Sequence, residues 1–177
     1  RKRLVPVLLM DRSLRLVKTV QFGARTYVGD PFNVVRLFNE MEVDEVVLLD
    51  IDYHSRGTSP DPGFVRELAS ECFMPLAYGG GLRHPSQCEA LSRMGVERFV
   101  FSREVWGTGL IRQASRILGS QAVLMCLDYQ GTGDQARCIP PSHRNDINQH
   151  PLTLAQEVQD EGAGEVVLQS VDRDGMR

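Results

Sequence analysis

Acidic side chains follow apolar runs at three places in the chain, which is the arrangement expected of an active site in an α/β protein. Strands buried on both faces read as nearly continuous apolar runs, and in such folds the chemistry lies just past their carboxyl ends. Asp128 ends the run 122–127 and suits a general acid or base, although an acid that simply faces solvent is the alternative. The acids at the other two runs are Asp50, Asp52, Asp172 and Asp174.

A run of three glycines at 79–81 follows one apolar segment and precedes a helical pattern that starts near His84. Glycine lets backbone N–H groups approach an anion, and the N-terminus of a helix favours phosphate. This context predicts a phosphate site at Gly80 and Gly81. A flexible turn is the alternative, because three glycines by themselves are a weak motif.

Charged residues also stand immediately before four of the apolar runs, and their charges sum to zero. If the runs are parallel strands of a closed sheet, these residues lie on its amino-terminal face, where ion pairs would close the floor of the barrel. Ordinary solvated residues at strand starts are the alternative, and the sequence does not say which way the side chains point. The four residues are Arg3, Glu45, Arg98 and Glu165.

The positioning elements alternate along the chain, which predicts a parallel sheet covered by helices. Two long connections interrupt the alternation: 19–30, which has the length of a binding loop, and 129–150, which contains His143, Arg144, Asp146 and His150. The spacing in the second fits no metal template, so we predict no metal and no other cofactor. The predicted strands are 4–10, 45–52, 75–78, 98–102, 122–128 and 165–171, and the predicted helices are 31–41, 63–72, 84–94, 108–118 and 152–161.

Two segments repeat with a period of 120 residues. Pro31 to Asp52 and Pro151 to Asp172 each open a helical pattern with proline, continue into Glu-Val-Val-Leu, and end in an aspartate four residues after that leucine. Two units of 120 residues approach the ~250 residues of a (β/α)8 barrel. We therefore predict a single, incomplete (β/α)8 barrel domain over 1–177, with half-barrel 1 at about 1–120, the start of half-barrel 2 at about 121–177, and six of eight strands. Because the chain starts with Arg1, we expect a fragment of a longer protein.

Composition narrows the class of protein. The 177 residues carry a formal charge of −3, which argues against a nucleic-acid binder. The four cysteines form no Cys-x-x-Cys pair, which favours reduced, buried thiols and a cytoplasmic setting. No signal peptide and no apolar run near 18 residues is present, so we expect no membrane partner.

Motifs distributed over essentially the whole chain, in order, resemble the cyclase subunit of imidazole glycerol phosphate synthase. That family is a (β/α)8 barrel of two similar halves. The resemblance rests on Lys2-Arg3, Val17-Lys18-Thr19, Gly29-Asp30-Pro31, Asp44-Glu45, Leu49-Asp50-Ile51, Tyr78-Gly79-Gly80-Gly81, the segments 119–123 and 162–165, and Val171-Asp172-Arg173-Asp174-Gly175.

The resemblance implies an ammonia-using enzyme. A glutaminase subunit binds at the amino-terminal face and ammonia crosses the barrel. At the opposite face it reacts with a phosphorylated small molecule to give imidazole glycerol phosphate and an aminoimidazole ribonucleotide. The implied roles are catalysis for Asp128; substrate or phosphate binding for Lys18, Asp50, Gly80, Gly81, Asp174 and Gly175; and an ammonia gate of Arg3, Glu45, Arg98 (usually lysine) and Glu165.

Two departures from the family pattern alter this expectation. The first catalytic aspartate of the family falls on Leu9 or Met10, and Asp11, one or two residues further on, is the candidate replacement. Ser102 and Arg103 stand where the family has Asn-Thr, and Arg103 is the residue left to hold phosphate.

A retained gate with a lost acid resembles the divergent cyclase-like branch associated with surface polysaccharides. In that branch the barrel supplies ammonia to a sugar-modifying amidotransferase, and we expect the same function here. An ordinary synthase subunit that uses Asp11 and an inactive scaffold that binds the glutaminase are the alternatives.

Overall fold

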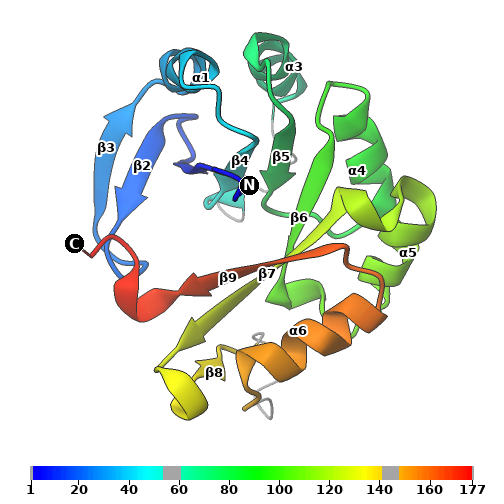
Figure 1. Ribbon diagram of the computed structural model, residues 1–177. Helices are drawn as coiled ribbons and strands as arrows, with labels where there is room; N and C mark the ends of the chain where they lie inside the picture. The colour runs from blue at the N-terminus through cyan, green and yellow to red at the C-terminus, as the bar shows by residue number, and fades with distance from the viewer. Residues whose placement is uncertain (1, 54–60, 141–147, 177) are drawn as a thin grey trace. The chain divides into compact units, whose positions relative to one another are not determined.

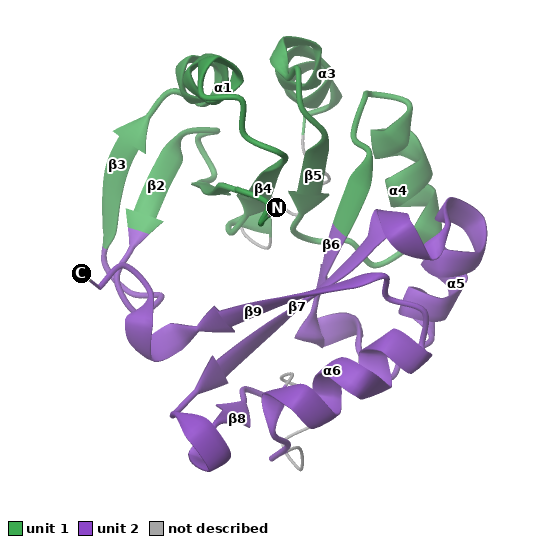
Figure 2. Cartoon of the chain, in the orientation of Figure 1, with its two compact units in different colours: residues 1–18, 25–99 green, residues 19–24, 100–177 purple. Residues whose placement is uncertain are grey.

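Parallel strands alternate with helices along the computed structural model, which describes residues 2–53, 61–140 and 148–176 (Figure 1). The expected fold class, a mixed α/β protein with a parallel sheet and alternating helices, is confirmed. The chain divides into two compact units (Figure 2). The first unit spans residues 1–18 and 25–99, and the second unit spans residues 19–24 and 100–177. The predicted half-barrels, about 1–120 and 121–177, stay a prediction.

Five strands of the first unit lie in the order β3-β2-β1-β4-β5. The last three of these strands are parallel: β1 (Val7–Met10) pairs with β4 (Val46–Asp50), and β4 pairs with β5 (Leu76–Gly79). β2 (Leu16–Thr19) runs antiparallel to β1, and β3 (Arg25–Gly29) is the outer, mostly exposed strand. β4 and β5 are almost wholly buried, as expected of strands covered on both faces.

The helices that the structure describes in the first unit each begin with proline, whose fixed φ suits the first turn. They are α1 (Pro31–Glu40), α3 (Pro62–Glu71) and α4 (Pro85–Ser92). The carboxylates of Asp30 and Asp61 accept hydrogen bonds from the first backbone N–H groups of α1 and α3. These caps fix where each of the two helices begins.

The second unit is built around β7 (Val123–Gln130), which pairs in parallel with β9 (Glu165–Ser170) and antiparallel with the short β8 (Arg137–Cys138). β6 (Arg98–Ser102) begins in the first unit and ends in the second. The remaining elements are the helices α5 (Leu110–Leu118) and α6 (Pro151–Asp160) and the short 3-10 helices η1 (Arg103–Val105), η2 (Ser120–Ala122), η3 (Gly133–Gln135) and η4 (Val171–Arg173).

Both long connections predicted from the sequence contain strands, so those predictions were wrong in part. Segment 19–30 is mainly the turn and the second strand of the β2–β3 pair, and segment 129–150 contains η3 and β8. The first strand starts at Val7, three residues later than predicted, since Pro6 has no N–H to give to a ladder. His143, Arg144 and Asp146 lie outside the described residues.

Within the described ranges, no helix is long and apolar enough to cross a membrane.

Candidate functional site

A buried carboxylate lies at the amino end of β4. Glu45 is 3% exposed, and its Oε2 accepts from Arg98 at 2.6 Å and from Arg3 at 3.2 Å. Arg98 is mostly buried and Arg3 is half-exposed. The other oxygen, Oε1, is buried and has no hydrogen-bond partner among the described residues. The structure thus brings together three of the four predicted gate residues at one end of the strands.

The fourth gate residue, Glu165, belongs to the second unit. It is the first residue of β9 and pairs in register with Leu124 of β7. Its side chain is partly buried. Glu165 therefore stands at the amino end of a parallel strand, as predicted, and its membership of a common ring of charges stays a prediction.

At the carboxyl end of β4, Asp50 is almost as buried as Glu45, at 2% exposed. Its Oδ2 accepts from the hydroxyl of Tyr78 at 3.2 Å, and its Oδ1 accepts from the backbone N–H of Asp52 at 3.1 Å. Gly80 packs against the Asp50 backbone with φ of +120°, so a Cβ there would overlap the Asp50 carbonyl oxygen. Asp50 is thus the anchor of the β4 and β5 strand ends.

Packing also requires glycine at position 81, because a Cβ on Gly81 would press on the Tyr53 ring. The next residues are held by Gln87 of α4, whose Oε1 accepts from the backbone N–H groups of Arg83 and His84 at 2.7 and 2.9 Å. This geometry accounts for both glycines by close approach of the backbone. Phosphate binding at Gly80 and Gly81 stays a prediction.

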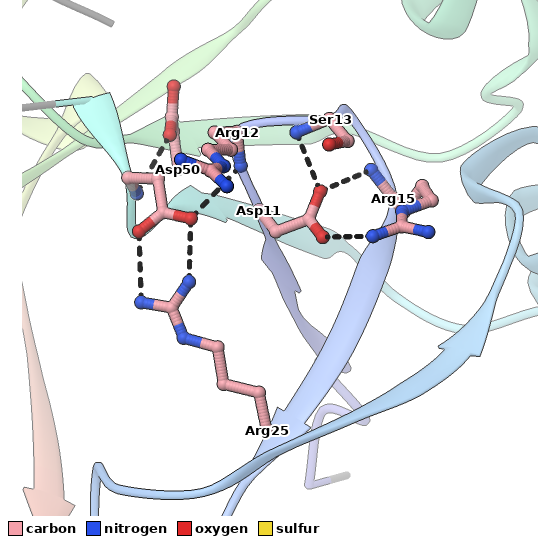
Figure 3. A network of polar contacts seen from close by, with 7 residues as sticks. Asp11, Arg12, Ser13, Arg15, Arg25 and Asp50 are labelled. Carbon is pink, nitrogen blue, oxygen red and sulfur yellow. Dashed lines mark hydrogen bonds and ion pairs between the residues drawn. The ribbon is translucent and has the colours of Figure 1, made fainter. Parts of the chain in front are cut away.

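Asp11 closes the turn between β1 and β2 (Figure 3). Its Oδ1 accepts from the N–H groups of Ser13 and Arg15, and its Oδ2 accepts from the Arg15 guanidinium at 3.2 Å. Burial raises the pKa of Asp11, but the backbone N–H groups of Arg15 and Ser13 and the Arg15 charge outweigh it, so the pKa is lowered overall. Both oxygens of this carboxylate are engaged, which does not suit a proton donor.

Met10, the residue before Asp11, is completely buried at the end of β1 and lies in register with Asp50. The family's strand-one acid was expected to fall on Leu9 or Met10. An apolar side chain therefore ends this strand, and the acid that follows it belongs to a turn.

A second ion pair in the same region joins β3 to the residues that follow β4. The guanidinium of Arg25 on β3 binds both oxygens of Asp52, at 2.6 and 2.9 Å, and the Arg12 N–H donates to Oδ2 at 3.0 Å. The Arg25 hydrogen bonds lower the pKa of Asp52, burial opposes them, and the net direction is downward. Lys18 lies exposed on β2. Arg25 was not among the predicted site residues, because nothing in a single sequence pairs it with Asp52.

In the second unit, Asp128 lies near the carboxyl end of β7. Its Oδ1 is 3.9 Å from the Sγ of Cys126, two residues earlier on the same face of the strand. Burial raises the pKa of Asp128, and the charge of Arg103 only partly offsets this. A carboxyl group that holds its proton more readily than usual is suited to general-acid chemistry.

Ser102 and Arg103 stand at the end of β6, where Ser102 is exposed and the Arg103 Nε lies 3.6 Å from the Glu104 carboxylate. The position of Arg103 is close enough for its charge to act on Asp128. This agrees with a cationic contact near the predicted acid, while phosphate binding by either residue stays a prediction.

Asp174 and Gly175 hold the tip 19–24 within the second unit. The Oδ2 of Asp174 accepts from the Thr19 hydroxyl at 2.6 Å and from the Phe22 N–H at 3.0 Å. Gly175 has φ of +67° and packs against the Thr19 carbonyl. The contacts of Asp174 are those of an anchor for a turn, and its role in phosphate binding stays a prediction.

Among the described residues, no group of three or more His, Cys, Asp or Glu side chains is arranged to hold a metal ion.

Parallel strands with a buried, arginine-paired carboxylate at their amino ends and acids at their carboxyl ends define an α/β protein with polar groups at both ends of its sheet. Residues 3–177 match the family described as histidine biosynthesis protein, and the chain belongs to this family.

Three relatives carry provisional names as imidazole glycerol phosphate synthase subunits. The Vibrio vulnificus protein, hisF3, is 40% identical over 99% of this chain and 68% of its own length. The Leptospira borgpetersenii protein, HisF, is 39% identical over 99% of this chain and 70% of its own length. The Pseudomonas aeruginosa protein, hisF2, is 39% identical over 100% of this chain and 71% of its own length.

Replacing Arg98 should destabilise the protein far more than replacing Arg3. Arg98→Met leaves the buried Glu45 carboxylate with a half-exposed partner, and breaking a buried ion pair typically costs about 3 kcal/mol or more. Arg3→Met is the matched control and should cost less than about 1 kcal/mol, since exposed pairs contribute little. Urea unfolding of both variants measures the difference. Equal losses would contradict the central place given to Arg98.

The Asp52–Arg25 ion pair should make stability depend on acidity. Because the pKa of Asp52 is lowered in the folded protein, its contribution is complete above the unfolded pKa of about 3.9 and is lost as the pH falls through the lower, folded value. At pH 7, Asp52→Asn should therefore cost up to about 1 kcal/mol after screening by solvent. The difference from wild type should shrink in urea unfolding as the pH falls below about 4. The exposed Asp134→Asn is the control, and an Asp52→Asn effect that is equal at pH 3 and pH 7 would count against this interpretation.

Proposed function

We propose that this chain is a cyclase-like subunit of the imidazole glycerol phosphate synthase type that receives ammonia from a glutaminase. In this proposal it passes the ammonia to a phosphate-binding face, for amidation of a surface sugar. The observation that carries the proposal is the contrast between the two ends of β1. Before the strand, Arg3 is paired with the buried Glu45, and at its end the apolar Leu9 and Met10 occupy the two positions at which the acid of the family was expected.

The cluster at the amino end has properties suited to an ammonia entrance. Two arginines share Oε2 of Glu45, while the buried Oε1 has no partner among the described residues. Ammonia is a neutral molecule with N–H groups to donate, so a carboxylate oxygen is a suitable acceptor for it. The two guanidinium groups would oppose the entry of cations such as ammonium.

Exposed apolar side chains near the same strand ends support docking of a partner. Leu4 and Met41 are each 55% exposed and Phe73 is 87% exposed. The Leu4 backbone is hydrogen-bonded to Asp44, just before β4, and Phe73 lies between α3 and β5. Large exposed apolar side chains around a charged centre are typical of a protein interface. The proposed occupant is the glutaminase.

The acceptor is proposed to differ from the imidazole precursor, because one of two acids is missing. Asp128, the acid that the resemblance implies for catalysis, has a raised pKa, caused first by burial. Asp11 has both oxygens bound to the turn 11–15 and a lowered pKa. Loss of a general acid or base commonly lowers a rate by 10²–10⁴-fold.

An ordinary cyclase subunit is the second candidate, favoured by the provisional names of the relatives. In that case Asp11 would have to leave the turn and take over the role of the missing acid. A scaffold that only binds the glutaminase is a third candidate and predicts no ligand at either phosphate site.

The full chain, mixed with its glutaminase, should stimulate glutamine hydrolysis and yet turn over the imidazole precursor at least about 10²-fold more slowly than an ordinary synthase. Leu9→Asp or Met10→Asp, whichever restores the missing acid, should recover part of this turnover, while Asp11→Asn should leave glutamine hydrolysis unchanged. The ordinary-cyclase alternative instead requires Asp11→Asn to abolish turnover. Turnover near that of an ordinary synthase in the wild-type protein would refute the proposal.

The sugar acceptor is tested in cells. Deletion of the gene should remove glutamine-derived ¹⁵N from the surface polysaccharide, and growth without histidine should continue. A histidine requirement in the deletion strain would point to the ordinary cyclase. Unchanged labelling of the polysaccharide would exclude a surface sugar as the acceptor of the ammonia.

Phe73→Asp should weaken binding of the glutaminase at least tenfold, because it places a charge where an apolar side chain is proposed to enter the partner. Isothermal titration calorimetry measures the affinity. Ile117→Asp is the matched control, since Ile117 is an exposed apolar residue of α5 in the second unit. An equal loss in both variants, or none in Phe73→Asp, would reject this docking surface.

A further inference from the structure

Two polar side chains of the second unit lie next to one thiol. Asp128 of β7 and Gln169 of β9 are directly paired in the parallel ladder, so their side chains lie on the same face of the sheet. Cys126 lies on this face as well, two residues before Asp128. Its Sγ is 3.9 Å from the Asp128 Oδ1 and 3.8 Å from the Gln169 Oε1.

The thiol of Cys126 is a hydrogen donor at neutral pH. Burial raises its pKa to about 12, and the negative charge of Asp128 acts in the same direction. A thiol carries a single proton, whereas two oxygens lie within its reach. At any moment it can donate to the carboxyl of Asp128 or to the carboxamide of Gln169, but not fully to both.

Other charged and titratable groups also act on Asp128, from each neighbouring element. Arg103, after β6, favours the carboxylate, and Asp174, after η4, disfavours it. Cys138 of β8 is a second buried thiol, and the charge of Asp128 contributes to the rise in its pKa to about 11, which is caused mainly by burial. Cys126 differs from these groups because it contacts both Asp128 and Gln169.

We propose that Cys126 is a positioning residue whose single S–H, shared between Asp128 and Gln169, holds these two side chains next to each other. Gln169 thereby influences the proton on Asp128, and the carboxyl and carboxamide form a joint contact for a polar group of the substrate, such as a hydroxyl or an amide. When a ligand donates to the carboxamide oxygen, the thiol proton becomes available to Asp128. This inference rests on the proposed function for the role of Asp128 as an acid.

The test reads the carboxyl of Asp128 directly, by ¹³C NMR titration of the full chain, and requires no substrate and no glutaminase. Cys126→Ala removes a hydrogen donor to the carboxylate, so the measured pKa of Asp128 should rise. Cys126→Ser, which keeps a donor, should bring the value back toward wild type. Cys138→Ala is the matched control, because it removes a buried thiol from the adjacent strand. It should leave the measured pKa of Asp128 unchanged. Circular dichroism verifies that each variant folds.

A double-mutant cycle tests the sharing of the proton. Gln169→Met removes the competing acceptor, and its effect on the Asp128 titration should be present with Cys126 and absent in the Cys126→Ala background. A simple change in burial would act equally in both backgrounds. Equal effects, or an unchanged titration in Cys126→Ala, would overturn the proposal. Because no ammonia transfer is measured, either result leaves the proposed function to be decided by its own assays.

Discussion

Strand β4 carries a buried carboxylate at each of its ends, and the first unit is arranged around the need to keep both satisfied. Glu45 precedes the strand and Asp50 completes it, each at most 3% exposed. Removing a carboxylate from water costs several kcal/mol unless charges or donors replace the lost solvent. Arg98 and Arg3 supply charges at one end, and the Tyr78 hydroxyl and a backbone N–H supply donors at the other.

The carboxylates at the two ends of β4 are stabilised by different kinds of contact, and this difference fits their proposed roles. Glu45 is held by charges and keeps one oxygen without a partner among the described residues, so it can still accept a small donor. Asp50 instead fixes the backbone around it, and Gly80 can approach only because it lacks a Cβ. In the second unit, Asp128 is only partly stabilised by the charge of Arg103, and burial raises its pKa toward the protonated form. Incomplete stabilisation of this kind is common at functional sites.

The apolar runs predicted most of the strands and helices, because a buried parallel strand and a proline-led helix have strong local patterns. The β2–β3 pair was missed, although the alternating pattern on each side of Gly23 is a usable hairpin signal. Asp11 shows the limit more clearly. Its position in the sequence suits a catalytic acid at a strand end. In the structure, however, its carboxylate accepts hydrogen bonds from the N–H groups of Ser13 and Arg15, so it belongs to a turn. Contacts such as Arg25–Asp52 depend on tertiary structure, which one sequence does not reveal.

The tip 19–24 belongs to the second unit, although the residues on both sides of it belong to the first. The chain therefore passes between the units three times, and no single cut can divide it into two self-sufficient pieces. A fragment that started at Val100 would leave Asp174 without the Thr19 hydroxyl and the Phe22 N–H that it accepts from. The second unit is completed by a segment donated from early in the chain, so during synthesis on the ribosome this segment must wait for most of the protein to emerge before its final contacts can form.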